Sequence, residues 1–157
     1  MASLIPTNSR VLDLGAGQQY LRGLLEGSCE YIAADLTGDD RTIECDLNVR
    51  PLPDFTSLGA DVCVLSGVLE YVANVPELTR WLAITAPTVI ASYVCAKPAH
   101  GFRAIVQRLG RARKGWFSDY SEAQLVECFS GAGFSLVLRT PWEVNSQPVF
   151  EFRREGS

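Results

Sequence analysis

The sequence has no long hydrophobic run and no leader-like start. Its longest uncharged stretch extends from Trp81 to Ala96 and is interrupted by Pro87, whereas a membrane-spanning helix needs about 20 consecutive apolar residues. The N-terminus lacks the basic region that opens a signal peptide, and the first strand pattern begins close to Met1. We therefore expect a cytoplasmic protein.

Paired cysteines are also missing. The five cysteines are an odd number, contain no C-x-x-C pair and lie singly in or beside apolar segments, where a free cysteine behaves as a small buried hydrophobe. We therefore expect neither a disulfide framework nor a metal site. The cysteines are Cys29, Cys45, Cys63, Cys95 and Cys128.

The remaining composition is that of an ordinary globular chain with one basic segment. The 157 residues, 47% hydrophobic and 20% charged, fit one domain over 1–157 with a basic insertion at about 97–118. Residues 97–114 hold six of the 14 basic residues and no acid. The rest of the chain is therefore strongly acidic, and a pI near 5.0 argues against broad nucleic-acid binding.

One short motif indicates a ligand site. Residues 11–17 read Val-Leu-Asp-Leu-Gly-Ala-Gly, a buried strand that runs into a turn opened by two glycines. Doubly wound α/β domains begin in this way and bind ligands outside the carboxyl ends of their strands. Tyr20 stands where a dinucleotide fingerprint would have its third glycine, and Asp35 ends the next apolar run.

Apolar periodicity predicts alternating strands and helices, and hence a mostly parallel sheet. Between the second and third strands too few residues remain for a crossover helix, so a loop must reach a short third strand. The last two strands are joined by a segment that is also too short for a crossover and should form an antiparallel hairpin. Strands are predicted at about 10–15, 30–35, 41–46, 61–66, 88–95, 133–140 and 147–154, and helices at about 18–27, 74–84 and 121–131.

These features together resemble the class I S-adenosylmethionine-dependent methyltransferases, in their small-molecule branch. Asp13-Leu-Gly15-Ala-Gly17 looks like the first motif of that family, and Asp35 looks like its second-strand acid. Glu44 to Asn48 is similar to the third motif, and Ser66 to Val72 is similar to the segment after the fourth strand. The resemblance covers residues 10 to 154 and implies a Rossmann-like, doubly wound, seven-stranded sheet with a C-terminal antiparallel hairpin.

The resemblance implies S-adenosylmethionine as the cofactor and a set of residues around it. Asp35 would hold the ribose hydroxyls, while Asp46 and the following backbone would face the adenine. The residues assigned to the cofactor are Asp13, Gly15, Ala16, Gly17, Asp35, Leu36, Asp46, Leu47, Ser66 and Gly67.

Elementary chemistry favours the same cofactor over a dinucleotide. A pyrophosphate needs glycines and no adjacent anion, whereas S-adenosylmethionine has no phosphate and carries a sulfonium and an ammonium. An ionised acid at the second strand end can accept strong hydrogen bonds from vicinal hydroxyls. The alternative interpretation is that Asp13 caps local backbone and that Asp35 and Asp46 are solvated strand-end acids.

The catalytic candidates are His100 and Glu70. Methyl transfer depends largely on positioning, but an acceptor hydroxyl or ammonium needs a base to remove its proton. His100 follows the fifth strand and Glu70 follows the fourth. The alternatives are a solvated surface histidine and a carboxylate favoured by the start of a helix.

The basic segment bears on the acceptor. Phe102, Ile105, Val106 and Leu109 recur at helical spacing, and a basic loop follows. We expect this segment to bind a small, anionic or sugar-like acceptor, with a solvated charged face and a membrane or nucleic-acid surface as the alternatives. The residues assigned to the acceptor are Tyr71, Arg111, Arg113, Lys114 and Trp116.

The resemblance departs from the family pattern at the N-terminus. Relatives have helices before the first strand that cover the cofactor, and the expected fold lacks these cover helices. A homodimer or a larger assembly would then cover the site. The main hypothesis is methyl transfer to an oxygen or nitrogen of a small acceptor; the alternatives are a non-catalytic methyltransferase-like binding module and a nicotinamide-dependent oxidoreductase.

Overall fold

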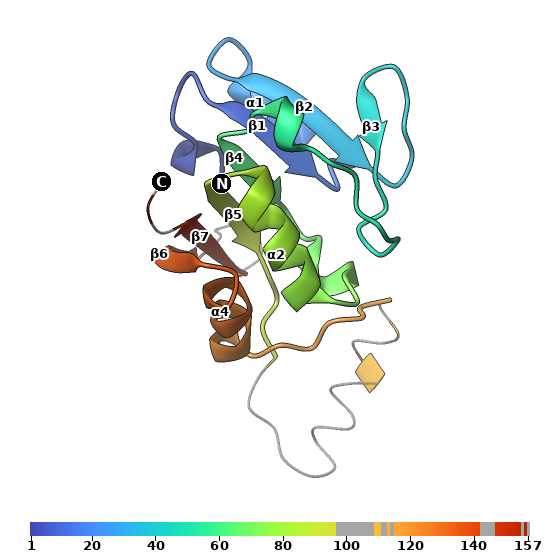
Figure 1. Cartoon of the computed structure of the whole chain (residues 1–157), viewed down its shortest axis with the longest axis vertical. Coiled ribbons are helices and arrows are strands. Elements are labelled where there is room, and N and C mark those ends of the chain that lie inside the picture. The colour runs from blue at the N-terminus through green and yellow to red at the C-terminus, as the bar shows by residue number, and fades with distance from the viewer. Residues whose placement is uncertain (97–108, 111–112, 114, 142–146, 155, 157) are drawn as a thin grey trace.

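The computed structural model describes residues 1–96, 109–110, 113, 115–141, 147–154 and 156. Strands and helices alternate along most of this part of the chain (Figure 1). In chain order the elements are η1 (Ala2–Leu4), β1 (Arg10–Leu14), α1 (Tyr20–Leu25), β2 (Glu30–Asp35), β3 (Thr42–Glu44), η2 (Thr56–Leu58), β4 (Val62–Leu65), η3 (Leu69–Tyr71), α2 (Val75–Thr85), β5 (Thr88–Ser92), α4 (Glu122–Ser130), β6 (Phe134–Pro141) and β7 (Pro148–Arg154).

The described strands form one seven-stranded sheet in the order β3-β2-β1-β4-β5-β7-β6. Strands β1 to β5 pair in parallel, and β7 pairs antiparallel with both β5 and β6. The predicted mixed sheet with a C-terminal hairpin is confirmed. The strand order reverses beside β1, and such a switch point is where open α/β sheets bind ligands.

Alternating side chains of the strands build a core on each face of the sheet. Helices α2 and α4 lie side by side against one face (Figure 1), where Phe129 of α4 stacks on Phe152 of β7 with ring centroids 3.8 Å apart. On the other face Val11, Val64 and Ile90 are buried in a second cluster under α1 and η1. Burial on both faces explains why β1 and β4 read as apolar runs.

The starts of the two longer helices are fixed by side-chain caps. The Asn74 side chain accepts a hydrogen bond from Glu77 N at the start of α2. Ser121 and Gln124 form a reciprocal capping box at the start of α4. Both are the polar N-cap residues that satisfy otherwise unpaired helix N–H groups.

Two elements differ from the expected lengths. Helix α1 is shorter than the predicted 18–27 because Gln19 has a left-handed φ of 56° and Gly27 has a φ of 73° just beyond its end. Strand β3 is only three residues long, and the loop before it pairs Asp39 N with Thr42 O at 3.0 Å. The β2 to β3 connection is thus the predicted loop.

Part of the basic insertion lies outside the described residues. The amphipathic helix predicted around Phe102, Ile105 and Val106 falls there. Among the residues that the structure does describe, no helix has the length and apolar character to cross a membrane.

Candidate functional site

The turn after β1 requires glycine for two reasons at Gly15. Its φ is +72°, and a Cβ built on it would lie 2.5 Å from Val68 Cγ2. The end of β1 therefore packs directly against the segment that follows β4. Gly17 also has a positive φ, of 51°, but a Cβ there would meet nothing within 4 Å.

Three backbone N–H groups of this turn, those of Gly15, Ala16 and Gly17, donate within the protein. Gly15 N and Ala16 N donate to Ala34 O at 2.8 and 3.2 Å, and Gly17 N donates to Asp35 Oδ2 at 2.5 Å. A pyrophosphate is normally held by such N–H groups. These three N–H groups therefore hold the ends of β1 and β2 together instead of facing a ligand, which argues against a pyrophosphate bound by them.

A cavity of about 220 Å³ opens where β1, β2, β3 and β4 end. Two carboxylates, from Asp35 and Asp46, line it among mostly apolar side chains and glycines. A flat apolar ring with hydroxyl and amine groups at its edges fits such walls. The lining residues are Gly15, Asp35, Leu36, Cys45, Asp46, Leu47, Asn48, Gly67, Val68, Tyr71 and Val72.

The Asp35 carboxylate is fixed by two backbone donors. Its Oδ1 accepts a hydrogen bond from Leu36 N at 2.6 Å and its Oδ2 accepts one from Gly17 N at 2.5 Å. An ionised carboxylate has about four lone-pair sites, so each oxygen can accept a further hydrogen bond. Asp35 can therefore receive two vicinal hydroxyls without losing either backbone contact.

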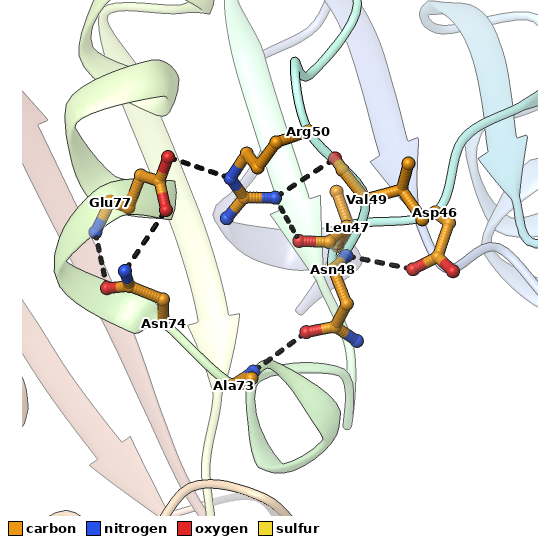
Figure 2. Close-up of polar contacts among 8 residues, drawn as sticks. All are labelled: Asp46, Leu47, Asn48, Val49, Arg50, Ala73, Asn74 and Glu77. Carbon is orange, nitrogen blue, oxygen red and sulfur yellow. Dashed lines mark hydrogen bonds and ion pairs between the residues drawn. The ribbon is translucent and has the colours of Figure 1, made fainter.

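The Asp46 carboxylate is oriented by the loop that follows it. Its Oδ1 accepts a hydrogen bond from Asn48 N at 2.8 Å. Figure 2 shows this contact beside the one in which the Asn48 side chain accepts from Ala73 N at 2.8 Å. The same side chain donates to Tyr71 O at 2.9 Å. The wall formed by Asp46 is thus joined to the wall formed by Tyr71.

Asp13 lies outside this cavity, in the layer between β1 and α1. It is buried, and the Tyr31 hydroxyl donates a hydrogen bond to its Oδ2 at 2.5 Å. The Arg22 guanidinium lies over the Tyr31 ring, 4.8 Å from its centroid. Burial raises the pKa of Asp13 to about 6, the Tyr31 hydrogen bond lowers it, and the nearby Asp35 charge raises it further.

The structure brings most of the assigned cofactor residues together. Those that line the cavity are Gly15, Asp35, Leu36, Asp46, Leu47 and Gly67, whereas Asp13, Ala16, Gly17 and Ser66 do not line it. Tyr71, assigned to the acceptor from the sequence, lines it too. Arg113 is exposed and Trp116 partly buried, both away from the lining; His100, Arg111 and Lys114 lie outside the described residues.

The sequence reasoning missed four lining residues, Cys45, Asn48, Val68 and Val72. All four lie within the motif segments Glu44 to Asn48 and Ser66 to Val72, so their position in these segments could have identified them. Burial raises the pKa of the Cys45 thiol to about 11, and the thiol is therefore neutral at physiological pH. Within the described ranges, no cluster of metal-ligating side chains occurs.

Glu70 is buried just behind the cavity wall. Its Oε1 accepts a hydrogen bond from Val94 N at 2.7 Å, and its backbone carbonyl accepts from Phe117 N and Ser118 N at 2.8 and 3.1 Å. Ser118 Oγ in turn donates to Leu69 O at 2.7 Å. Glu70 thus joins η3 to both the segment that leaves β5 and the segment that leads into α4.

A larger open groove of about 580 Å³ lies beside α1. It is lined by Gly17, Gln18, Gln19, Arg22 and Glu26 among others, and by neither of the carboxylates that follow β2 and β3. The carboxylates and the switch point of the sheet meet at the smaller cavity. We therefore identify the smaller cavity as the candidate site.

Solved structures similar to this chain are methyltransferases or their complexes. An S-adenosylmethionine-dependent methyltransferase from Mesorhizobium loti is similar over 97% of this chain and 94% of its own, with a TM-score of 0.71 and 17% identity. A chain in the complex between the Haloferax volcanii Trm112 methyltransferase activator and its methyltransferase partner is similar over 98% and 85%, with a TM-score of 0.71 and 14% identity.

A third similar structure holds ligands. It is an O-methyltransferase of neocarzinostatin biosynthesis in complex with S-adenosyl-L-homocysteine and 1,4-dihydroxy-2-naphthoic acid. It is similar over 98% of this chain and 50% of its own, with a TM-score of 0.67 and 22% identity. No protein-family model matches the sequence, and no curated protein matches it significantly. The chain has the fold of class I S-adenosylmethionine-dependent methyltransferases.

Proposed function

We propose that the chain is a methyltransferase that uses S-adenosylmethionine to methylate an oxygen or nitrogen of a small acceptor. The observation that carries this proposal is the cavity at the switch point, where the carboxylates of Asp35 and Asp46 face apolar walls beside a turn whose first three N–H groups donate within the protein. Similarity of fold to methyltransferases supports it.

The residues present fit a cationic nucleoside. Asp35 is placed to accept hydrogen bonds from the ribose hydroxyls, and Asp46 to accept one from the exocyclic amine of adenine, while Leu36, Leu47 and Val68 provide the apolar walls. Bound S-adenosylmethionine would supply an electrophilic methyl group on a sulfonium. The net negative charge of the cavity favours a positive ligand.

The contribution of the protein to the reaction is mainly one of position. The side chains around the cavity would hold the donor, and a closed site would exclude water. Where the acceptor must lose a proton, His100 and Glu70 are the proposed bases. Glu70 is buried and accepts from Val94 N at 2.7 Å, so it can serve in this role only if the acceptor reaches it from the cavity.

We propose that the acceptor is small and anionic or sugar-like. Tyr71, which lines the cavity, and the basic residues Arg111, Arg113 and Lys114 with Trp116 are the proposed contacts. The hydroxylated naphthoic acid in the neocarzinostatin enzyme is a small anionic molecule and supports this class for a protein of the same fold. A cytoplasmic location and a homodimer or larger assembly over the site belong to the same proposal.

A non-catalytic binding module is the second candidate. The connection between β2 and β3 contains no helix. The archaeal protein of the same fold that is solved with the Trm112 activator offers a precedent for assembly with a second chain. In this alternative the cavity binds the nucleoside without turnover.

Two measurements separate these functions. Thermal unfolding is followed with S-adenosylmethionine, S-adenosylhomocysteine and NAD, since a ligand that binds only the native state raises the Tm. Transfer of a labelled methyl group to a panel of phenolic, carboxylate-bearing and sugar acceptors is then measured. We expect both adenosyl ligands, but not NAD, to raise the Tm and at least one acceptor to be labelled; stabilisation with no labelling favours the binding module.

A further inference from the structure

Asn48 connects the two walls of the cavity through its side chain. Its Nδ2 donates to Tyr71 O at 2.9 Å and its Oδ1 accepts from Ala73 N at 2.8 Å. Tyr71 ends η3, which follows β4, while Asn48 lies in the loop after β3. The two segments are more than 20 residues apart in the chain, and this one amide joins them.

The backbone of the same residue orients a proposed cofactor ligand. Asn48 N donates to Asp46 Oδ1 at 2.8 Å, so the carboxylate turns back over its own loop. One residue therefore sets both the separation of the walls and the direction of the Asp46 carboxylate.

Arg50 secures the outer side of this loop (Figure 2). Its Nη1 donates to Leu47 O at 2.9 Å and to Val49 O at 3.2 Å, and its Nε lies 2.9 Å from Glu77 Oε1. Glu77 is in the first turn of α2, where Asn74 caps it. The loop after β3 is thus anchored to α2 on one side and to η3 on the other.

We infer that Asn48 is a positioning residue that holds the cavity in its cofactor-binding shape before the cofactor arrives. The inference rests on the proposed function of the same cavity. Both hydrogen-bonding ends of the Asn48 amide are engaged by backbone groups of the opposite wall. Because the walls are already ordered, binding does not have to order two loops, and the entropic cost that would lower the affinity is smaller. Asn48 is also exposed, so its removal leaves the core intact.

The chain offers a matched control in Asn74. Its Nδ2 donates to Glu77 Oε2 at 3.0 Å and its Oδ1 accepts from Glu77 N at 3.2 Å. Asn74 is therefore also an exposed asparagine whose amide makes two local hydrogen bonds, but it does not line the cavity. Asn48→Ala and Asn74→Ala remove the same atoms and the same number of side-chain contacts.

The test is calorimetric binding of S-adenosylhomocysteine to the wild type, Asn48→Ala and Asn74→Ala, with the Tm of each. We expect Asn48→Ala to raise the Kd roughly tenfold, the effect of losing the net stabilisation of about one to two hydrogen bonds. Asn74→Ala should weaken binding clearly less than Asn48→Ala although it lowers the Tm at least as much, because it removes a helix cap and leaves both contacts of the Asn48 side chain in place.

Hydrogen exchange supplies a second readout. The Ala73 amide should exchange faster in Asn48→Ala than in the wild type and should be unchanged in Asn74→Ala, because only Asn48 accepts its hydrogen bond. Equal affinities of both variants for S-adenosylhomocysteine would overturn the inference. Absence of binding by the wild type would instead overturn the proposed function.

Discussion

Gly15 is the residue whose substitution should disturb the site most directly. A Cβ there would lie 2.5 Å from Val68 Cγ2, and Val68 lines the cavity. We expect Gly15→Ala to displace Val68, to lower stability and to abolish detectable binding of S-adenosylhomocysteine. Gly17→Ala is the control, because Gly17 also has a positive φ but a Cβ there would clash with nothing. We expect it to lower the free energy of unfolding by only about 1 kcal/mol. Calorimetric binding with equal affinity in both variants would contradict the assignment of Val68 to the wall.

Asp13 gives the protein a specific dependence on pH. Burial raises its pKa from 3.8 to about 6, so between these values the folded protein keeps a proton that the unfolded chain has lost. The protonated Asp13 carboxyl therefore contributes to the free energy of unfolding in full below pH 3.8. This contribution is lost as the pH rises through about 6, where the folded protein releases the proton as well. Asp13→Asn removes this titration but keeps an oxygen that can accept from Tyr31.

We expect the difference in unfolding free energy between the wild type and Asp13→Asn to change with pH. Urea unfolding of the wild type and Asp13→Asn across that pH range should show the wild type losing roughly 3 kcal/mol relative to the variant. Comparison with the variant cancels the titration of the other carboxylates. A difference that does not vary with pH would show that the Asp13 pKa is not raised.

At the residue scale, the sequence predicted which residue types meet at the site better than it predicted where each side chain points. Asp35 ends β2, Asp46 follows β3, and both line the cavity as expected. Asp13 lies inside its strand, where successive side chains alternate between faces, and register decides that it meets Tyr31 instead. The spacing of the motif carries no information on that choice.

At the scale of elements, η3 links the cavity to the second half of the chain through Glu70. Glu70→Gln keeps an oxygen that can accept from Val94 N, and we expect it to fold and bind S-adenosylhomocysteine like the wild type. Glu70→Ala leaves the partly buried Val94 N–H without this acceptor and should lower the free energy of unfolding in urea by about 1–3 kcal/mol. Equal destabilisation by Gln and Ala would contradict this account of the contact.

The same pair of variants tests Glu70 as a base. An amide cannot take up the proton, so loss of methyl transfer in Glu70→Gln with unchanged binding and stability would assign the base role to Glu70. Retained transfer in Glu70→Gln would leave Glu70 as a structural residue.

Elements were predictable where the apolar pattern is continuous. Strands β1 and β4 are buried and read as apolar runs, and α2 and α4 show helical spacing with polar caps. The start of α1 was not predictable, because Gln19 before it adopts a left-handed φ of 56°, which is rare for residues other than glycine. Its side chain donates to Thr42 Oγ1 at 2.8 Å, a contact with a distant segment that no local pattern contains.

At the scale of the whole molecule, topology brings the site residues together. The switch in strand order beside β1 places the ends of four parallel strands at one edge of the sheet, which made the position of the site predictable from alternating strands and helices. The acceptor was not predictable in the same way, because acceptor contacts lie on loops that vary with the substrate rather than with the fold.

The central claim is that this cavity binds the adenosyl group of the methyl donor through Asp35. Calorimetric titration of the wild-type protein and of Asp35→Ala with S-adenosylhomocysteine tests it most directly. We expect saturable binding at one site in the wild type and at least a tenfold weaker affinity in the variant, because two charge-assisted hydrogen bonds are lost. Absence of binding by the folded wild type, or equal affinity in Asp35→Ala, would contradict the account.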